Sequence, residues 1–366
     1  MAKRHAFPPV FLASVALVAG ACTGGGASPA APSAAPSASQ AESASPGASQ
    51  ARTWEGQLKV TVVEDWNFGY PPWQIWLYPK SQGWYKDVGL DVEFVIPPTP
   101  ADPPKFIATN QAQMGFTYTP DTLTAKESGL DLLAVSSLIP VPSEHLICRD
   151  DAGISKPKDL VGKKIASYQV PLPDAQFKIF ANAQGIDASK VTTVSAGDNG
   201  YPVMMAKQSD CTQAGVFEPS FYKSDTGREP VTFYYTEWGL PDWYWEIIAV
   251  NPGFAQEHPD AVKAFVDVTL RGYTYARDHI DETLAYLYTV FPEAKPPGAV
   301  EYNADAMQKM FARQDKEYVT SKPQGCMDPA IWQRFSDLMA ENGVLKAPID
   351  VGPIVSNEFL PSDCGF

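Results

Sequence analysis

Six aromatic side chains and three prolines are concentrated in the sixteen residues 64–79, "EDWNFGYPPWQIWLYP". The prolines interrupt regular structure in this stretch. Flat, rigid rings on an irregular segment can stack on a planar ligand, which stabilises a complex by about 0.5 to 1.5 kcal/mol per ring pair beyond surface burial. We therefore expect Trp66, Tyr70 and Trp73 to contact a flat ligand. For Trp76 and Tyr78 we favour the alternative, a helical face packed in the core.

Polar side chains that could give specificity follow several segments predicted to be strands. These candidates are Tyr118, Thr119 and Asp121 in "TYTPD", Ser167, Tyr168 and Gln169 in "ASYQ", and Glu218 in "VFEP". Ligand sites of α/β proteins form at the carboxyl ends of parallel strands, so these residues are expected to line one cleft. A carboxylate such as Glu218 could accept a charge-assisted hydrogen bond from a ring amine. The alternatives are a helix cap for Thr119 or Asp121 and a solvated loop for Glu218.

The segment "PDWYWE" adds three aromatic residues, Trp243, Tyr244 and Trp245. Side chains alternate across a strand, so only one side of this segment can face a cleft, and we choose Tyr244. The candidates are aromatic and acidic, which disfavours a small anion as ligand. We find no Ser/His/Asp, Cys/His or metal-ligand spacing, so the sequence predicts no catalysis, no metal site and no cofactor.

Strand-like segments alternate with amphipathic ones, which predicts an α/β architecture. "QLKVTVVEDW" alternates as a strand does, and further strands are expected at 114–118 and 132–137. "HPDAVKAFVDVTLRGYTYARDH" has helical periodicity with Pro259 in its first turn, and later helices fit 281–290, 303–318 and 329–342. The order of elements predicts two lobes, each a mainly parallel sheet flanked by helices, with a cleft between them.

The chain is expected to cross between the lobes near residues 140–147 and 240–250. We assign residues 54–143 to the first part of lobe 1, 144–243 to lobe 2, and 244–366 to the return of lobe 1 with the C-terminal helices. The net charge of −14 argues against nucleic acid as a partner, because binding phosphates requires a basic face.

The N-terminus indicates export. Lys3 and Arg4 precede the apolar run "FLASVALVAGA", so residues 1–21 are expected to be a signal peptide, too short to span a bilayer. "LVAGAC" resembles a bacterial lipoprotein box in which Cys22 is lipidated; the alternative is plain cleavage with Cys22 as an incidental thiol. Residues 22–53 are mostly Gly, Ala, Ser and Pro, which predicts a disordered tether. We expect a cell-envelope lipoprotein, periplasmic or on the outer face of the cytoplasmic membrane, that touches the membrane only through its lipid.

Four further cysteines, Cys148, Cys211, Cys326 and Cys364, are disulfide candidates. An even number in an exported protein indicates disulfides, and four cysteines allow three pairings. We favour Cys148 with Cys211 and Cys326 with Cys364, because each pair then falls within one lobe.

Several stretches resemble a known family. They are "GWYKDVGLDVEF", "FTYTPDTLTAKESGLDLLAVSSL", "AGISKPKDLVGKKIASY" and "GLPDWYWEIIAVNPGFAQEHPDAVKAFVDVTLRGYTYARDH", which cover most of residues 57–290. They resemble the periplasmic solute-binding proteins of ABC importers, in the group that binds thiamine pyrimidine precursors and has sulfonate- and riboflavin-binding relatives. The "YTPD" and "GLPDWYWE" stretches are the ones most similar to the pyrimidine-precursor branch.

The resemblance implies a monomeric binding protein that closes on a flat nitrogen heterocycle and delivers it to an ABC permease and its ATPase. The expected ligand is a hydroxymethylpyrimidine or formylaminopyrimidine, and riboflavin or another aromatic solute is the alternative. A pyrimidine-acting enzyme on the same scaffold and a ligand-sensing lipoprotein without a transporter are further alternatives. The loop "FGYPPWQIW" lacks the Pro-Asn and following His of this branch, so the polar contacts are expected to differ. The chain also lacks the cysteine cluster of the related pyrimidine synthase.

Overall fold

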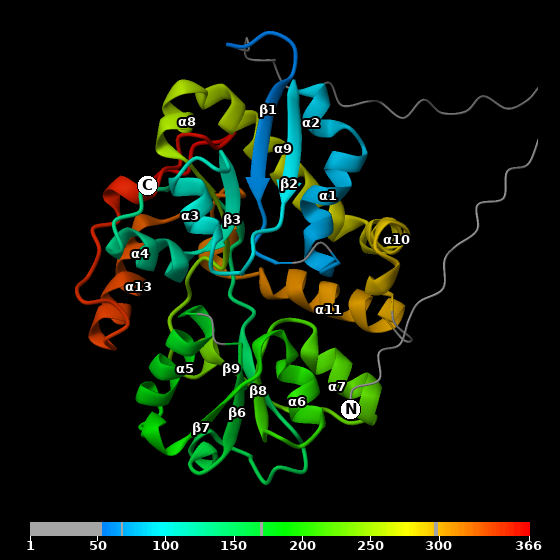
Figure 1. The fold of residues 1–366 in the computed structure, drawn as a ribbon, viewed down its shortest axis with the longest axis vertical. Helices are drawn as coiled ribbons and strands as arrows, with labels where there is room; N and C mark the ends of the chain where they lie inside the picture. The colour runs from blue at the N-terminus through cyan, green and yellow to red at the C-terminus, as the bar shows by residue number, and fades with distance from the viewer. Residues whose placement is uncertain (1–52, 67–68, 169–170, 296–298) are drawn as a thin grey trace, which may run out of the picture. The chain divides into compact units, whose positions relative to one another are not determined.

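Two five-stranded sheets organise the chain (Figure 1). The computed structural model describes residues 53–366 except 67–68, 169–170 and 296–298. The predicted signal peptide, Cys22 and all but the last residue of the predicted tether lie outside the described residues. The described residues belong to one compact unit. We call each sheet with the helices packed on it lobe 1 and lobe 2, in chain order.

The sheet of lobe 1 has the strand order β2-β1-β3-β10-β4. Its strands are β1 (Leu58–Val63), β2 (Leu90–Val95), β3 (Met114–Tyr118), β4 (Leu133–Ile139) and β10 (Glu246–Val250). β10 runs antiparallel to both of its neighbours, and the other four strands share one direction. The prediction of a mainly parallel sheet is therefore confirmed, with the reversed strand being the one by which the chain returns from lobe 2.

Burial explains the composition of these strands. β1 has the sequence LKVTVV, in which Val60, Val62 and Val63 are buried. β10 has the sequence EIIAV and is buried at every position, because it lies between β3 and β4. A central strand covered on both faces reads as a continuous apolar run rather than as an alternation.

The sheet of lobe 2 has the order β7-β6-β8-β5-β9 and repeats this plan. Its strands are β5 (His145–Cys148), β6 (Lys164–Ser167), β7 (Thr192–Ser195), β8 (Cys211–Ala214) and β9 (Val231–Tyr234). Here β5, the first strand after the chain leaves lobe 1, is antiparallel to both β8 and β9. The chain thus passes between the sheets between Ile139 and His145 and returns between Tyr234 and Glu246. The finer lobe boundaries proposed from the sequence remain proposals.

Thirteen α-helices occur in the described part of the chain. Their bounds are α1 (Gln74–Ser81), α2 (Trp84–Asp87), α3 (Pro103–Ala108), α4 (Thr119–Glu127), α5 (Pro171–Ala183), α6 (Gly200–Met205), α7 (Glu218–Thr226), α8 (Pro252–Glu257), α9 (Pro259–Asp278), α10 (Ile280–Val290), α11 (Ala299–Arg313), α12 (Glu317–Thr320) and α13 (Pro329–Glu341). None of the described helices is both long and apolar enough to cross a membrane.

The late helices do not return to lobe 1 alone. α11 contacts α9 in lobe 1 and α7 in lobe 2, and α13 contacts α4 and α5. Polar contacts also join the lobes through these helices, since the Ser220 hydroxyl donates to Asp305 at 2.8 Å. The C-terminal segment therefore bridges the two sheets, which the order of elements in the sequence did not predict.

The longest helix, α9, has the predicted amphipathic form. Its buried face includes Val262, Phe265 and Val266, and Pro259 occupies its first turn. α9 packs against α1 at Gly272, where an added Cβ would lie 2.0 Å from the backbone oxygen of Ile75. Only glycine permits this close approach, which fixes the aromatic segment on lobe 1.

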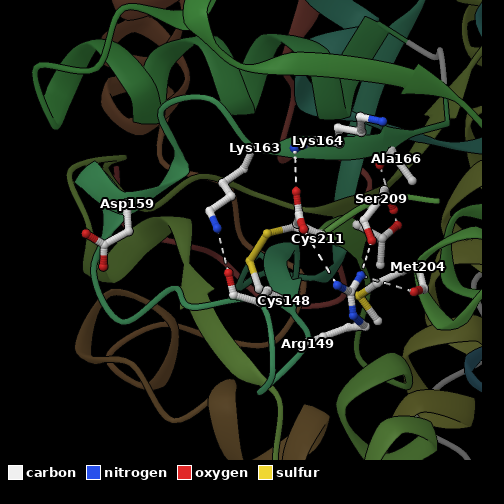
Figure 2. Close-up of a disulfide and its surroundings, with 12 residues drawn as sticks. Cys148, Arg149, Asp159, Lys163, Lys164, Ala166, Met204, Ser209 and Cys211 are labelled. Carbon is white, nitrogen blue, oxygen red and sulfur yellow. Dashed lines mark hydrogen bonds and ion pairs between the residues drawn. A yellow bond between two sulfur atoms is a disulfide. The ribbon is translucent and has the colours of Figure 1, made fainter. Parts of the chain in front are cut away.

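Two disulfides are present in the structure, Cys148–Cys211 and Cys326–Cys364. This is the pairing favoured from the sequence. Cys148 and Cys211 are opposite each other on the antiparallel strands β5 and β8, and both are fully buried. Figure 2 shows the disulfide beside Arg149, whose guanidinium donates to the backbone oxygen of Ser209.

Candidate functional site

A cavity of about 140 Å³ is lined by residues of both lobes. Lobe 1 and the returning segment contribute aromatic residues, Pro100, Ala101 and Asp121, and lobe 2 contributes mainly polar ones. The full lining is Trp66, Tyr70, Trp73, Pro100, Ala101, Tyr118, Asp121, Glu144, His145, Tyr168, Pro173, Gln176, Gln213, Ala214, Gly215, Glu218, Tyr235 and Trp245. It combines flat apolar walls with a few convergent polar groups, as small-molecule sites do.

The aromatic side chains that line the cavity pack against one another and against neighbouring rings. The ring centroids of Trp66 and Tyr168, from different lobes, lie 6.2 Å apart in an edge-on arrangement. Tyr118 stacks on Trp245 with centroids 5.9 Å apart. Tyr70 packs edge-on against Phe217 of lobe 2 at 5.0 Å. These contacts pre-organise ring faces and edges around the cavity before a ligand enters.

The aromatic segment is more regular than the sequence suggested. Pro71–Trp73 form a 3-10 turn that leads directly into α1, with Pro79 inside that helix. The Trp76 indole donates to Glu64 at 2.7 Å and the ring stacks on Phe116 at 4.0 Å. Trp76 is thus a core residue, as favoured from the sequence. Tyr78 is also buried.

Seven of the eleven predicted ligand residues line the cavity: Trp66, Tyr70, Trp73, Tyr118, Asp121, Tyr168 and Glu218. Trp73 is fully buried, and its indole nitrogen has no hydrogen-bond partner among the described residues. Glu218 is held in place, because it accepts from the Tyr168 hydroxyl at 3.2 Å and from the Gly215 N–H at 2.9 Å. Whether these residues bind a ligand remains a proposal.

The choice of Tyr244 needs correction, because Trp245 lines the cavity in its place. Tyr244 is buried, its hydroxyl accepts from the Asp328 N–H at 2.7 Å, and its ring packs edge-on against Tyr318. Residues 243–245 precede β10 and do not alternate as a strand, since Trp245 lines the cavity whereas Trp243 stacks on Phe335. The sequence did not fix which of these residues lines the cavity, and the structure does.

Two further predicted residues do not line the cavity. Thr119 is buried and its hydroxyl donates to the backbone oxygen of Tyr244 at 2.7 Å, which ties the start of α4 to the second crossing. Ser167 is buried and donates to Asp174 at 2.6 Å. Neither Thr119 nor Asp121 caps α4, since its N-cap residue is Tyr118, without a side-chain cap bond. Gln169 lies outside the described residues.

The sequence interpretation missed several polar cavity residues, chiefly Glu144, His145, Gln176 and Gln213. Glu144 and His145 lie at the first crossing, which the sequence predicts near 140–147. Residues at a crossing between lobes lie beside both walls of a cleft. The predicted position of the crossing was therefore the signal that could have identified Glu144 and His145 as cavity residues.

Carboxylates dominate the electrostatics of the cavity. Burial raises the pKa of Asp121 to about 7, and Asp65 nearby adds to the effect. Burial also raises the pKa of Glu144 to about 8, although the neighbouring side chains of Gln176 and Trp245 oppose this. The pKa of Glu218 is raised by burial as well. Among the described residues that line the cavity, none is Lys or Arg.

A second layer of acidic residues lies behind the aromatic wall of lobe 1. Glu64, Asp65 and Glu246 are all buried. Burial raises the pKa of Asp65 to about 6 and places those of Glu64 and Glu246 well above their usual range. Lys80 is a cation that acts on Glu64 and opposes this rise. Buried carboxyls without basic partners are held close to neutrality.

His145, at the start of β5 in lobe 2, adds an acceptor to the cavity lining. Its ring is fully buried, with Nδ1 2.6 Å from the backbone oxygen of Ser143. A carbonyl oxygen can only accept, so Nδ1 carries the proton and Nε2 is an acceptor. Burial lowers the pKa of His145 to about 4, so the ring is neutral near pH 7. Nε2 has no hydrogen-bond partner among the described residues.

These shifts predict that the unliganded protein loses stability as the pH rises from 6.5 to 8.5. In this range the unfolded chain has already released the protons of Asp121 and Glu144, whereas the folded protein releases them only as the pH passes about 7 and about 8, so raising the pH favours unfolding until both groups are ionised. His145 acts in the opposite direction, but only below its ordinary pKa near 6.5. A difference of one bound proton corresponds to about 1.4 kcal/mol per pH unit. Urea unfolding at several pH values measures the slope.

The slope should be smaller in Asp121→Asn, which cannot titrate. Asp267→Asn is the matched control, because Asp267 is exposed on α9 away from the cavity. A stability that rises over this pH range, or the same slope in Asp121→Asn and the control, would contradict the electrostatic description.

No group of three or more His, Cys, Asp or Glu side chains within the described ranges is placed to hold a metal ion. The chemistry that the cavity offers is stacking on aromatic rings and hydrogen bonding to carboxylates, an imidazole nitrogen, phenols and side-chain amides.

Comparison with known proteins agrees with this geometry. The family model described as "NMT1/THI5 like" matches residues 74–283. The formylaminopyrimidine-binding protein of Halalkalibacterium halodurans is 24% identical over 294 residues, which cover 79% of this chain and 87% of the relative. The 4-amino-5-hydroxymethyl-2-methylpyrimidine phosphate synthase of Legionella pneumophila is 22% identical, over 83% of this chain and 92% of the relative.

Among solved structures, the alkanesulfonate-binding protein SsuA of Xanthomonas axonopodis pv. citri, bound to MOPS, has a TM-score of 0.63 and 15% sequence identity. The match covers 82% of this chain and 98% of that protein. At this identity the likeness concerns the fold alone, and the fold is that of the two-lobe periplasmic binding proteins, as predicted.

Proposed function

Because the chain belongs to the NMT1/THI5-like family, we propose that it binds a thiamine pyrimidine precursor in the cavity between its lobes. A formylaminopyrimidine or hydroxymethylpyrimidine is the ligand that we favour, since a relative named for formylaminopyrimidine binding aligns with most of the chain. The observation that carries the proposal is the cavity itself, in which aromatic walls surround carboxylates and a neutral imidazole.

The size of the cavity favours one ring. An engineered apolar cavity of about 150 Å³ accommodates benzene, and the cavity here has about 140 Å³. A pyrimidine ring fits this space, whereas the three fused rings of riboflavin require the lobes to separate further. Trp66 and Tyr118 supply ring surface, and stacking on them gives affinity without demanding one substituent pattern.

The polar groups favour a ligand that carries hydrogen-bond donors. Asp121, Glu144, Glu218 and Nε2 of His145 are acceptors when the carboxyls are ionised, and an aminopyrimidine offers amine hydrogens to such groups. A sulfonate or phosphate would need cationic or N–H donors instead. The acidic lining therefore supports an amino-substituted ring over the anion that the fold neighbour's name indicates.

We include export and delivery in the proposal. The basic start and apolar run before Cys22 support a signal peptide and a lipid anchor, with residues 22–53 as a tether. Closure of the two lobes on the ligand would present the loaded form to an ABC permease and its ATPase, with the binding protein acting as a monomer.

A pyrimidine-acting enzyme is the rival function, because relatives of comparable identity are named as synthases. Incubation of the purified protein with formylaminopyrimidine separates the two. We expect the pyrimidine to be recovered unchanged by mass spectrometry. Conversion to a new product at more than the rate of a protein-free sample would establish the enzyme.

Native mass spectrometry of the purified protein tests the proposed ligand class. We expect a bound species whose mass matches a single-ring pyrimidine, released on unfolding. A co-purified flavin or an alkyl sulfonate would replace the proposed ligand.

Trp66→Ala is expected to weaken formylaminopyrimidine binding about tenfold, because the variant loses one stacked ring and its apolar contact. The fold should be kept, since Trp66 is only half-buried. Calorimetric titration measures the change, and Trp54→Ala is the control, a half-buried tryptophan outside the cavity. Unchanged affinity in Trp66→Ala would remove this residue from the site.

A further inference from the structure

The described cavity residues have an unusual balance of charge. Three of them are carboxylates, Asp121, Glu144 and Glu218, and they come from α4, the first crossing and α7. No Lys or Arg accompanies them among the described lining residues. Three anions brought together from both lobes repel one another unless a cation or protons neutralise them.

The groups around this cluster add no compensation. The titratable groups that line the cavity beside the carboxylates are phenolic or neutral: Tyr70, Tyr118 on β3, His145 on β5, Tyr168 after β6 and Tyr235 after β9. Those next to this lining are acidic: Glu64 and Asp65 after β1, Asp174 on α5 and Glu246 on β10. Two cations act on residues of this region without lining the cavity. Lys80 acts on Glu64, and Arg313 acts on His145 but stacks on Tyr234 instead of entering the cavity.

A second observation, independent of the carboxylates, indicates a ligand with donors. His145 lines the cavity, and Nε2 of its ring is a buried acceptor without a partner among the described residues. Leaving such an atom unsatisfied costs roughly as much as a lost hydrogen bond. A donor on a bound molecule would satisfy it.

We propose that the cavity selects a planar cation: a ring that carries a delocalised positive charge on adjacent N–H groups, as a protonated aminopyrimidine or an amidinium does. This inference rests on the proposed function and adds the charge state of the bound ligand. The carboxylates of α4, the first crossing and α7 neutralise that charge from both lobes, so the cation strengthens closure. Neutral flavins are excluded because they carry no positive charge. Phosphorylated pyrimidines are excluded because their added negative charge would face three carboxylates.

A matched pair of probes tests the charge requirement. Benzamidine and benzamide have nearly the same planar shape, and only benzamidine is cationic at pH 7.5. Titration of each into the full-length protein, followed by calorimetry, should show benzamidine bound at least tenfold more tightly. In Asp121→Asn and in Glu144→Gln the preference should shrink several-fold, whereas Glu93→Gln, which removes an exposed carboxylate of β2, should leave it unchanged. Two substituted carboxylates keep the test informative if one variant does not fold.

The outcomes separate this inference from the proposed function. Equal affinity for the two probes, a preference for benzamide, or binding of neither would overturn the cation requirement. If formylaminopyrimidine still binds in that case, the proposed function stands alone. If benzamidine is preferred but no pyrimidine binds, the cation requirement stands and the ligand class of the proposed function is wrong.

Discussion

Replacement of Glu218 by alanine is expected to weaken formylaminopyrimidine binding roughly 10- to 150-fold, which corresponds to the loss of a charge-assisted hydrogen bond of about 1.5 to 3 kcal/mol. Glu218 begins α7, lines the cavity, and is fixed by the Tyr168 hydroxyl and the Gly215 N–H. A pre-oriented carboxylate loses little freedom when a ligand amine binds it, so most of the interaction contributes to affinity.

Two further variants distinguish a ligand contact from an indirect effect. Tyr168→Phe removes the hydroxyl that holds Glu218 and should have a smaller effect than loss of the carboxylate. Glu93→Ala removes an equal charge at an exposed site on β2 and should leave affinity unchanged. If Glu218→Ala binds the pyrimidine as tightly as the parent protein while unfolding normally, Glu218 is a structural residue of α7.

The second large effect concerns stability. Cys148→Ala with Cys211→Ala should lower the free energy of unfolding by about 4 kcal/mol, because the disulfide closes a loop of 63 residues in the unfolded chain. Both sulfurs are buried and join adjacent strands of lobe 2, so alanine leaves a small cavity as well. Urea unfolding of the oxidised parent and the double variant measures the difference.

Ligand binding should respond much less to this change. The same two strands carry His145 and Ala214 into the cavity, but these residues lie three positions away from the disulfide along β5 and β8, roughly 10 Å. We therefore expect similar affinity for formylaminopyrimidine where the variant is folded. A loss of stability below about 1 kcal/mol would show that the strand pair is held by its neighbours rather than by the bond.

Much of the fold could be predicted because its signals are local. The helical periodicity after Pro259 and the β-branched run of β1 are consequences of burial, and burial leaves a pattern in the sequence. The bridging role of α11 and α13 had no such signal. The contacts of these two helices with both lobes depend on which surfaces meet after the sheets have formed. The amphipathic pattern of a helix predicts that one face is buried but not which element buries it.

The candidate site was predictable in part for the same reason. Residues at or just after the ends of strands, such as Tyr118, Tyr168 and Glu218, could be placed near a cleft by topology alone. Tyr244 and Trp245 could not be separated, since both precede β10 in a segment without strand structure, where side-chain alternation gives no guide. Asp121 was ambiguous between helix cap and ligand, and the structure places it at the cavity without a capping bond.

The most direct test of the account is a calorimetric titration of the full-length protein with formylaminopyrimidine at pH 7.5. The account predicts one site per chain with a Kd of about 1 µM or below, equivalent to −8 kcal/mol or stronger, and weaker binding in Trp66→Ala and Glu218→Ala. Absence of binding at millimolar concentration, or binding that neither variant alters, would contradict the claim that aromatic rings and carboxylates of both lobes enclose a pyrimidine.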